Sequence, residues 1–116
     1  MRRTLLLAAL VAPVAAFAAD GTMSFEMVAD PGNMTACLAM GPSFDRPFTV
    51  TVAGSNVTLT SPGGINMSME PAGPDKYHAV FELSGERLDS VADLGAAKTL
   101  SIRGNNLGCK WMGKAQ

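Results

Sequence analysis

Residues 48–60 read FTVTVAGSNVTLT, and they predict a β-hairpin. Apolar and hydroxyl side chains alternate with a period of two on both sides of Ala53-Gly54-Ser55-Asn56, which is typical of two half-buried strands joined by a tight turn. Phe48, Val50 and Val52 would then face a core, because alternate side chains of a strand point to opposite faces. The hairpin therefore predicts a sheet with one apolar face and one polar face.

The same alternation recurs along the rest of the chain, and Gly, Pro and Asn separate the runs. The predicted strands are Met23–Met27, Phe48–Val52, Asn56–Thr60, Ile65–Glu70, Tyr77–Leu83, Leu100–Arg103 and Leu107–Trp111. About seven short strands with frequent turns predict a mainly β fold, either a small antiparallel β-barrel or a sandwich.

Two segments depart from this alternation and predict one or two short helices. Asn33 can cap a helix that runs to Met40 and stops at Gly41-Pro42. In the second segment, Glu86 to Leu94, large apolar residues recur every three positions, and Gly95 follows as a stop signal. We expect this second helix or helical turn to pack across an end of the barrel.

The N-terminus has the three parts of a secretory signal. Arg2 and Arg3 precede an apolar run from Leu5 to Phe17, and small residues then surround a cleavage position after Ala18. The apolar run is too short to cross about 30 Å of hydrocarbon, so we expect no membrane span. We therefore predict a cleaved signal peptide at 1–18, a single β-rich domain at 19–116, and a bacterial protein that is periplasmic or secreted.

Cys37 and Cys109 are the only cysteines of the chain. Export would place them where disulfides persist, and two cysteines allow a single intramolecular pairing. We expect a Cys37–Cys109 disulfide, which would contribute about 4 kcal/mol by restricting the unfolded chain. A redox or metal-binding pair is the alternative, but no close cysteine spacing supports it.

The composition excludes several function classes. The 116 residues have a net charge of −1 and only 16% charged residues, so no polybasic arm for nucleic acid is present. The single histidine, His78, is a poor basis for acid–base catalysis, and no serine lies in a nucleophile elbow. We therefore expect a monomeric protein that is not an enzyme.

Methionine is the unusual residue, with 8 copies in the chain. Met67 and Met69 are two apart on a predicted strand and would project from one face, where two thioethers suit Cu(I). Together with His78 and Trp111 they resemble the small periplasmic copper-efflux chaperones, which use His, Trp and a Met-x-Met pair, although here His78 follows the pair. The alternative is that the methionines fill gaps in a core, in which case no cofactor is expected.

A second resemblance is to the small periplasmic lysozyme inhibitors, which are antiparallel barrels with a disulfide from an early to a late cysteine. Cys37, the strands from Phe48 and Tyr77, and the segment ending at Trp111 follow a similar order. That family inserts a Ser-Gly-x-x-Tyr loop into the lysozyme cleft, and residues 84–88 read SGERL here, with leucine in place of tyrosine. The resemblance implies an inhibitor of a hydrolase such as lysozyme.

The C-terminal part is basic. After Asp93 the chain has four bases and no acids; the bases are Lys98, Arg103, Lys110 and Lys114. This pattern suits either a solvated sheet surface or a basic edge for an anionic envelope partner. Taken together, the sequence predicts a small exported, non-enzymatic binding protein of the cell envelope with an unknown ligand or envelope protein as partner. Cu(I) binding and hydrolase inhibition are the alternatives.

Overall fold

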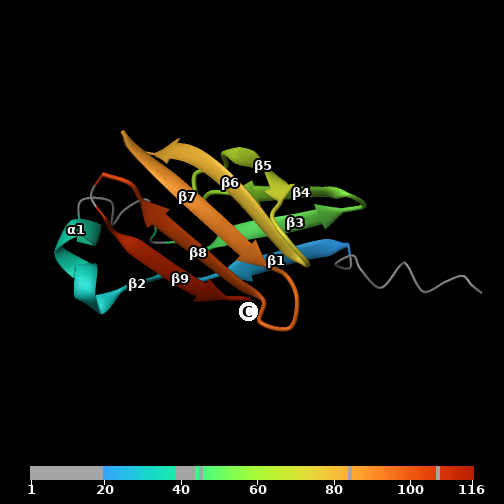
Figure 1. Ribbon diagram of the computed structural model, residues 1–116, viewed down its shortest axis with the longest axis horizontal. Helices are drawn as coiled ribbons and strands as arrows, with labels where there is room; N and C mark the ends of the chain where they lie inside the picture. Colours follow the sequence, from blue (N-terminus) through green and yellow to red (C-terminus); the bar gives the residue numbers. More distant parts are fainter. Residues whose placement is uncertain (1–19, 39–43, 45, 84, 107) are drawn as a thin grey trace, which may run out of the picture.

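The computed structural model of the protein describes residues 20–38, 44, 46–83, 85–106 and 108–116 (Figure 1). The strands in chain order are β1 (Gly21–Phe25), β2 (Val28–Ala29), β3 (Phe48–Ala53), β4 (Asn56–Thr60), β5 (Asn66–Pro71), β6 (Lys76–Leu83), β7 (Glu86–Asp93), β8 (Thr99–Gly104) and β9 (Lys110–Lys114). The prediction of a mainly β fold is confirmed, but the described residues form nine strands rather than seven. The predicted signal peptide at 1–18 and Leu107 lie outside the described residues.

All strands belong to one antiparallel sheet, ordered β1-β3-β4-β5-β6-β7-β8-β9-β2. The sheet curls like a half-barrel, so that β6, β7 and β8 cross in front of β3 and β4 in Figure 1. The two strands at the ends of this order, β1 and β2, are consecutive in the chain, and only Glu26 and Met27 separate them. Phe25 forms a bridge to Ala115, and the Gln116 amide donates a 3.0 Å hydrogen bond to the Ser24 carbonyl. The first segment of the described chain, residues 21–29, therefore supplies the strands at both ends of the sheet.

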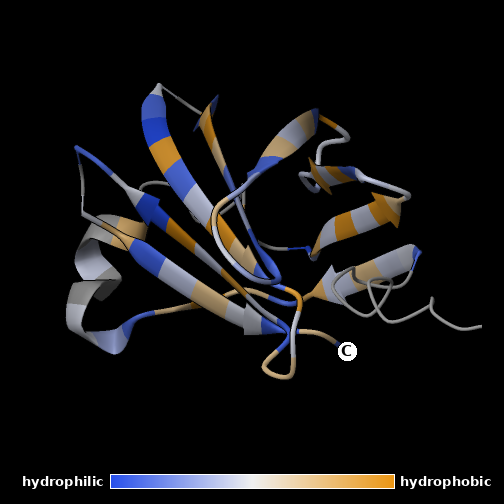
Figure 2. Cartoon of the chain, turned by 45° about the vertical axis from the view of Figure 1, so that its right-hand side comes forward, coloured by the Kyte–Doolittle hydropathy of each residue, from blue (hydrophilic) through white to orange (hydrophobic). Residues whose placement is uncertain are grey.

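The core fills the concave side of this sheet. Figure 2 shows apolar and polar bands alternating along the strands, as the period of two predicts. Fully buried apolar side chains come from most strands: Phe25, Phe48, Val50, Leu59, Leu88, Leu100 and Ile102. Phe44, which precedes β3, stacks on Trp111 of β9 with ring centroids 3.7 Å apart and also packs against Phe48 at 5.1 Å. These contacts tie the two halves of the curled sheet together.

Gly113 of β9 lies where the first segment bends from β1 to β2. A Cβ at this position would lie 2.7 Å from the Glu26 carbonyl oxygen and 2.9 Å from the Met27 sulfur. Glycine is therefore required here, because its lack of a side chain lets the bend pass directly over β9.

The predicted helix at Glu86–Leu94 is wrong, because strand β7 spans Glu86–Asp93. Its inward row consists of Glu86, Leu88, Ser90 and Ala92, all of them buried. Burial therefore alternates along β7 with a period of two, but the buried positions are not all apolar. The Ser90 hydroxyl is satisfied by a 2.8 Å hydrogen bond to the Ala79 carbonyl of β6. Such a partner makes a polar residue tolerable in a core, but it is invisible in the sequence.

The segment expected to be helical from Asn33 to Met40 has a 3-10 turn at Pro31–Asn33 followed by the five-residue α1 (Met34–Leu38). Residues 39–43, where that helix was expected to end, lie outside the described residues. Within the described part of the chain, no helix has the length and apolar character needed to span a membrane.

Candidate functional site

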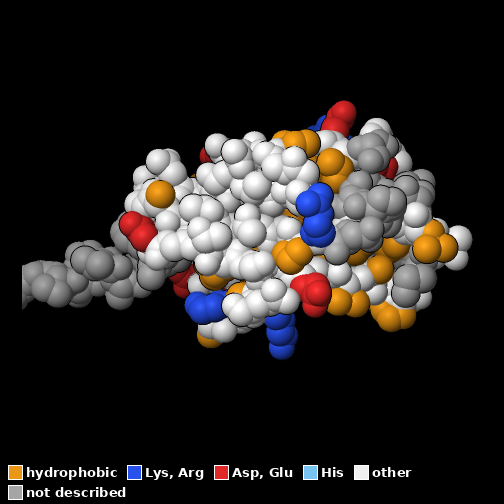
Figure 3. All heavy atoms as spheres, turned by 180° about the vertical axis from the view of Figure 1, so that it is seen from behind, with side chains coloured by type: hydrophobic (Ala, Val, Ile, Leu, Met, Phe, Trp, Pro, Cys, Tyr) orange, Lys and Arg blue, Asp and Glu red, His pale blue; other side chains and the backbone are white. Residues whose placement is uncertain are grey.

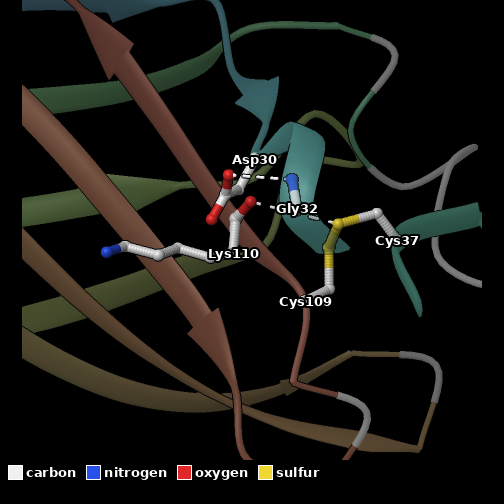
Figure 4. The surroundings of a disulfide bond; sticks show 5 residues. All are labelled: Asp30, Gly32, Cys37, Cys109 and Lys110. Atoms are coloured by element: carbon white, nitrogen blue, oxygen red, sulfur yellow. Dashed lines mark hydrogen bonds between the residues drawn. A yellow bond between two sulfur atoms is a disulfide. The ribbon is translucent and has the colours of Figure 1, made fainter. Parts of the chain in front are cut away.

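The disulfide between Cys37 and Cys109 is confirmed, with a Cα–Cα distance of 4.9 Å (Figure 4). It fastens the end of α1 to the start of β9. The Cys37 sulfur lies 3.9 Å from the Lys110 carbonyl oxygen, which is a contact rather than a hydrogen bond because a disulfide sulfur carries no hydrogen. The same carbonyl accepts a 2.8 Å hydrogen bond from the Asp30 amide, and the Asp30 carboxylate accepts a 3.1 Å bond from the Gly32 amide. The chain after β2 is thus held firmly against β9.

A groove of about 420 Å³ lies along this junction. Its lining residues are Val28, Ala29, Asp30, Pro31, Lys110, Trp111 and Met112. Val28 and Met112 are direct cross-strand partners and are 65% and 47% exposed. Two large apolar side chains therefore stand side by side in solvent, next to an open hollow.

Charged residues of both signs flank this apolar pair: Lys110 and Lys114 stand on either side of Met112, and the exposed acids Glu26 and Asp30 stand on either side of Val28. Arg103 of β8 and Lys110 of β9 are exposed and lie directly opposite each other, and Lys114 follows on the same face of β9. Like charges placed directly opposite each other in a sheet are destabilising. The outward positions of β8 and β9 hold no acid, so the bases predicted from the sequence gather on these two strands; Asp89 of β7, the direct partner of Arg103, and Asp30, which lines the groove, border them. We call Val28, Met112, Arg103, Lys110 and Lys114 the basic–apolar face.

The residues proposed as Cu(I) ligands do not come together on one face. Met69 is buried beside Val57, and Met67 is partly buried beside Leu59, so both lie on the core side of β5. His78 pairs with Glu70 on the other side of the sheet, and its Nε2 lies 3.6 Å from an Asp89 oxygen. Copper binding by the two thioethers alone stays a prediction.

The acids of β6 and β7 are divided by the sheet. Glu82 is exposed and Asp89 is partly exposed, whereas Glu86 is only 3% exposed and accepts a 3.1 Å hydrogen bond from the Asn106 amide. Among the described residues, no group of three or more His, Cys, Asp or Glu side chains could hold a metal ion.

The element that resembles the lysozyme-inhibitor loop lies at the turn between β6 and β7. Gly85 has a positive φ of 78°, as a tight turn requires, and Ser84 lies outside the described residues. Leu88, which stands where that family has tyrosine, is fully buried in the core. Position 88 therefore presents no side chain to solvent.

Sequence reasoning missed Val28 and the groove beside it. The two-residue strand β2 is too short to show an alternation, and its pairing with β9 joins positions about 80 residues apart. Met112 gave a weak signal, since an apolar residue directly after the inward Trp111 must face outward.

Comparisons with protein-family models, with curated proteins and with solved structures give no match for this chain. Its function is therefore inferred from its residues and their geometry.

Proposed function

We propose that this chain is a small exported, non-enzymatic binding protein of the cell envelope that holds a protein partner at the basic–apolar face. One observation carries the proposal: Val28 and Met112 are exposed as a pair beside a groove of about 420 Å³, and Lys110 lines the same groove. Contiguous exposed apolar side chains rimmed by polar groups mark interaction sites in soluble proteins.

The chemistry of this face suits one kind of partner segment. Val28 and Met112 offer apolar area, and methionine adapts its shape to different contacts. Arg103 lies between Asp89 and Lys110 across the strands and so already has an acidic neighbour, whereas Lys110 and Lys114, on either side of Met112, can attract an acidic group of a partner. The partner is therefore a protein segment that carries an apolar side chain flanked by acidic ones.

The concave side of the sheet is filled by packed side chains, which supports binding on the outer side. Its inward side chains from β3, β8 and β9 are buried, and Trp111 is covered by the stacked ring of Phe44. A ligand would have to displace this packed core to enter, which would forfeit the apolar burial that stabilises the fold.

The cellular location and the absence of catalysis rest on the sequence. The pattern at residues 1–18 is that of a secretory signal, and a disulfide is compatible with an oxidising compartment. A single histidine and the lack of a nucleophile elbow support a binding role over an enzymatic one.

Site-specific photocrosslinking tests the proposal in cells that carry the gene. Benzoylphenylalanine in place of Met112 should give a discrete protein adduct after irradiation. The matched control position is Val80, which is also apolar, outward and 42% exposed, but lies on β6. We expect no discrete adduct from position 80.

Charge reversal checks that the adduct reports the proposed surface. Lys110→Glu should lower the adduct yield at position 112 roughly fivefold, because about 0.5 kcal/mol of attraction becomes a similar repulsion. Lys76→Glu, an exposed lysine on β6, should leave the yield unchanged. Equal adducts at positions 80 and 112, or a yield insensitive to Lys110→Glu, would overturn the proposal.

A further inference from the structure

The outer face of β1, β3, β4 and β5 holds only hydroxyl and amide side chains at eight adjoining positions. They are Thr22, Ser24, Thr49, Thr51, Thr58, Thr60, Asn66 and Ser68. In its own strand, each of the eight residues is next to an inward-facing residue and therefore faces outward. All eight are exposed or partly exposed. We call this set the hydroxyl face.

The strand register orders these eight side chains into two rows. Thr51 pairs with Thr22 on one side and with Thr58 on the other, and Thr58 pairs in turn with Ser68. The second row runs through Ser24, Thr49, Thr60 and Asn66 by the same pairings. Neighbouring groups in a row are therefore about 4.8 Å apart, and the rows are about 7 Å apart.

Hydrogen bonds hold parts of this array in place. Thr22 and Thr51 share a hydroxyl–hydroxyl hydrogen bond of 3.2 Å, and the Thr60 hydroxyl donates to the Asn66 side-chain oxygen at 2.7 Å. A hollow of about 410 Å³ lies over the array, lined by Thr51, Thr58, Thr60, Asn66 and Ser68. A hydroxyl that makes one such bond still has a donor or acceptor for a ligand.

None of these eight positions carries a charge, although Glu70, the next outward residue of β5, lies at their border. The outward positions of β6 to β9 include Lys76, Asp89, Arg103 and Lys110, so this chain does place charges on solvated strands. Figure 3, the view from behind, shows a broad white area over the strands of the hydroxyl face, with charged side chains mostly around it. Strand propensity favours threonine over other polar residues, but it does not exclude lysine or glutamate from all eight positions.

We propose that the hydroxyl face binds an uncharged glycan chain. A sugar ring presents hydroxyls that both donate and accept, as the threonine and serine hydroxyls do, so the two surfaces can exchange hydrogen bonds without burying a charge. The eight positions themselves offer no ion to attract a charged polymer, and the bordering Glu70 lies opposite His78 of β6. None of the eight is a large apolar anchor for a protein partner. Rows of groups one strand spacing apart suit an extended oligosaccharide that bonds to successive strands.

This proposal is independent of the protein partner at the basic–apolar face, since the two faces lie on different strands. It predicts chain-length dependence, because a longer glycan engages more strands of a row at once. The probe is the neutral tetramer of N-acetylglucosamine, titrated into ¹⁵N-labelled protein and followed by backbone amide shifts. We expect saturable shifts confined to β1, β3, β4 and β5, and much weaker binding of the monomer.

Paired variants separate recognition from folding. Thr51→Val with Thr58→Val keeps the shape and strand propensity of both residues but removes their hydroxyls. We expect the tetramer to bind about tenfold more weakly, as the loss of two hydrogen bonds implies. Thr99→Val, on the outward side of β8, is the control and should bind as the unmodified protein does.

The inference would be overturned by the absence of saturable shifts with the tetramer, by shifts that map to β6–β9 instead, or by equal affinity in the Thr51→Val, Thr58→Val variant. Amide spectra of that variant establish that it is folded, so weaker binding cannot be read as unfolding. A charged comparator, the deacetylated tetramer, should bind no better than the neutral one; stronger binding would also contradict the proposal.

Discussion

At the scale of single residues, strand phase predicted burial well. Val50 was expected inside and is fully buried; Leu59 and Ile102, which alternate with polar residues in the same way, are fully buried too, and Trp111, in phase with Cys109, is 3% exposed. Phase is a local property, so it can be read from neighbours along the chain. The ring that stacks on Trp111 could not be predicted, because Phe44 comes from outside the strands and meets it only through tertiary structure.

The methionines of β5 give a test at this scale. Met67→Leu with Met69→Leu nearly conserves side-chain volume, so we expect the free energy of unfolding to fall by less than about 1.5 kcal/mol per site. Cu(I) affinity should be the same in the variant and the unmodified protein, because core packing accounts for both side chains. Chemical denaturation and competitive Cu(I) titration measure the two quantities. Tight copper binding that disappears in the variant would instead establish a thioether site.

At the scale of elements, strands with a regular apolar row were predictable and the others were not. The β3–β4 hairpin was expected with its turn, and the structure pairs Val50 with Leu59 as that hairpin requires. Strand β7 was missed because Glu86, Ser90 and Ala92 fill its inward row, while Val91 faces outward and imitates a helical spacing. The polar inward residues are tolerated because of hydrogen bonds to other strands and turns, which the sequence does not show.

The contact of Gly113 in β9 with Glu26 and Met27 can be tested by substitution. Gly113→Ala places a methyl group against the Glu26 carbonyl and the Met27 sulfur. We expect a loss of about 1–3 kcal/mol in the free energy of unfolding, since backbone must shift to make room. A thermal melt should show a fall of about 4–8 °C for each kcal/mol.

Gly63→Ala is the control for this variant. Gly63 lies in the exposed turn between β4 and β5, and a Cβ there would meet only the Ser61 hydroxyl, at 3.9 Å. It should melt close to the unmodified protein. Equal melting of the Gly113 and Gly63 variants would show that the bend does not pass over β9 as described.

At the scale of the whole molecule, the curled sheet separates two surfaces of different chemistry. The strands β1, β3, β4 and β5 carry the uncharged hydroxyl face, and β8, β9 and β2 carry the basic–apolar face. Neither surface could be assembled from the sequence, because strand order and register are non-local. The disulfide was predictable because two cysteines allow one pairing, but its position beside the groove was not.

The disulfide also gives a test of global stability. Cys37→Ala with Cys109→Ala removes a crosslink between residues 72 apart, and we expect the free energy of unfolding to fall by about 4 kcal/mol. Urea denaturation measures the change, and the unmodified protein under reducing conditions should lose a similar amount. A loss below about 1 kcal/mol would mean that α1 and the start of β9 are held by other contacts.

Native mass spectrometry of the protein, released gently from the envelope of its own cells, tests the central claim of an exported binding protein most directly. The predicted spectrum contains a chain that starts after Ala18 and lacks the two hydrogens of a free dithiol. Part of the signal should be a defined complex with a protein partner, and Lys110→Glu should weaken that complex. A chain with its leader and free thiols would contradict export, and a bare monomer at every concentration would contradict the binding role.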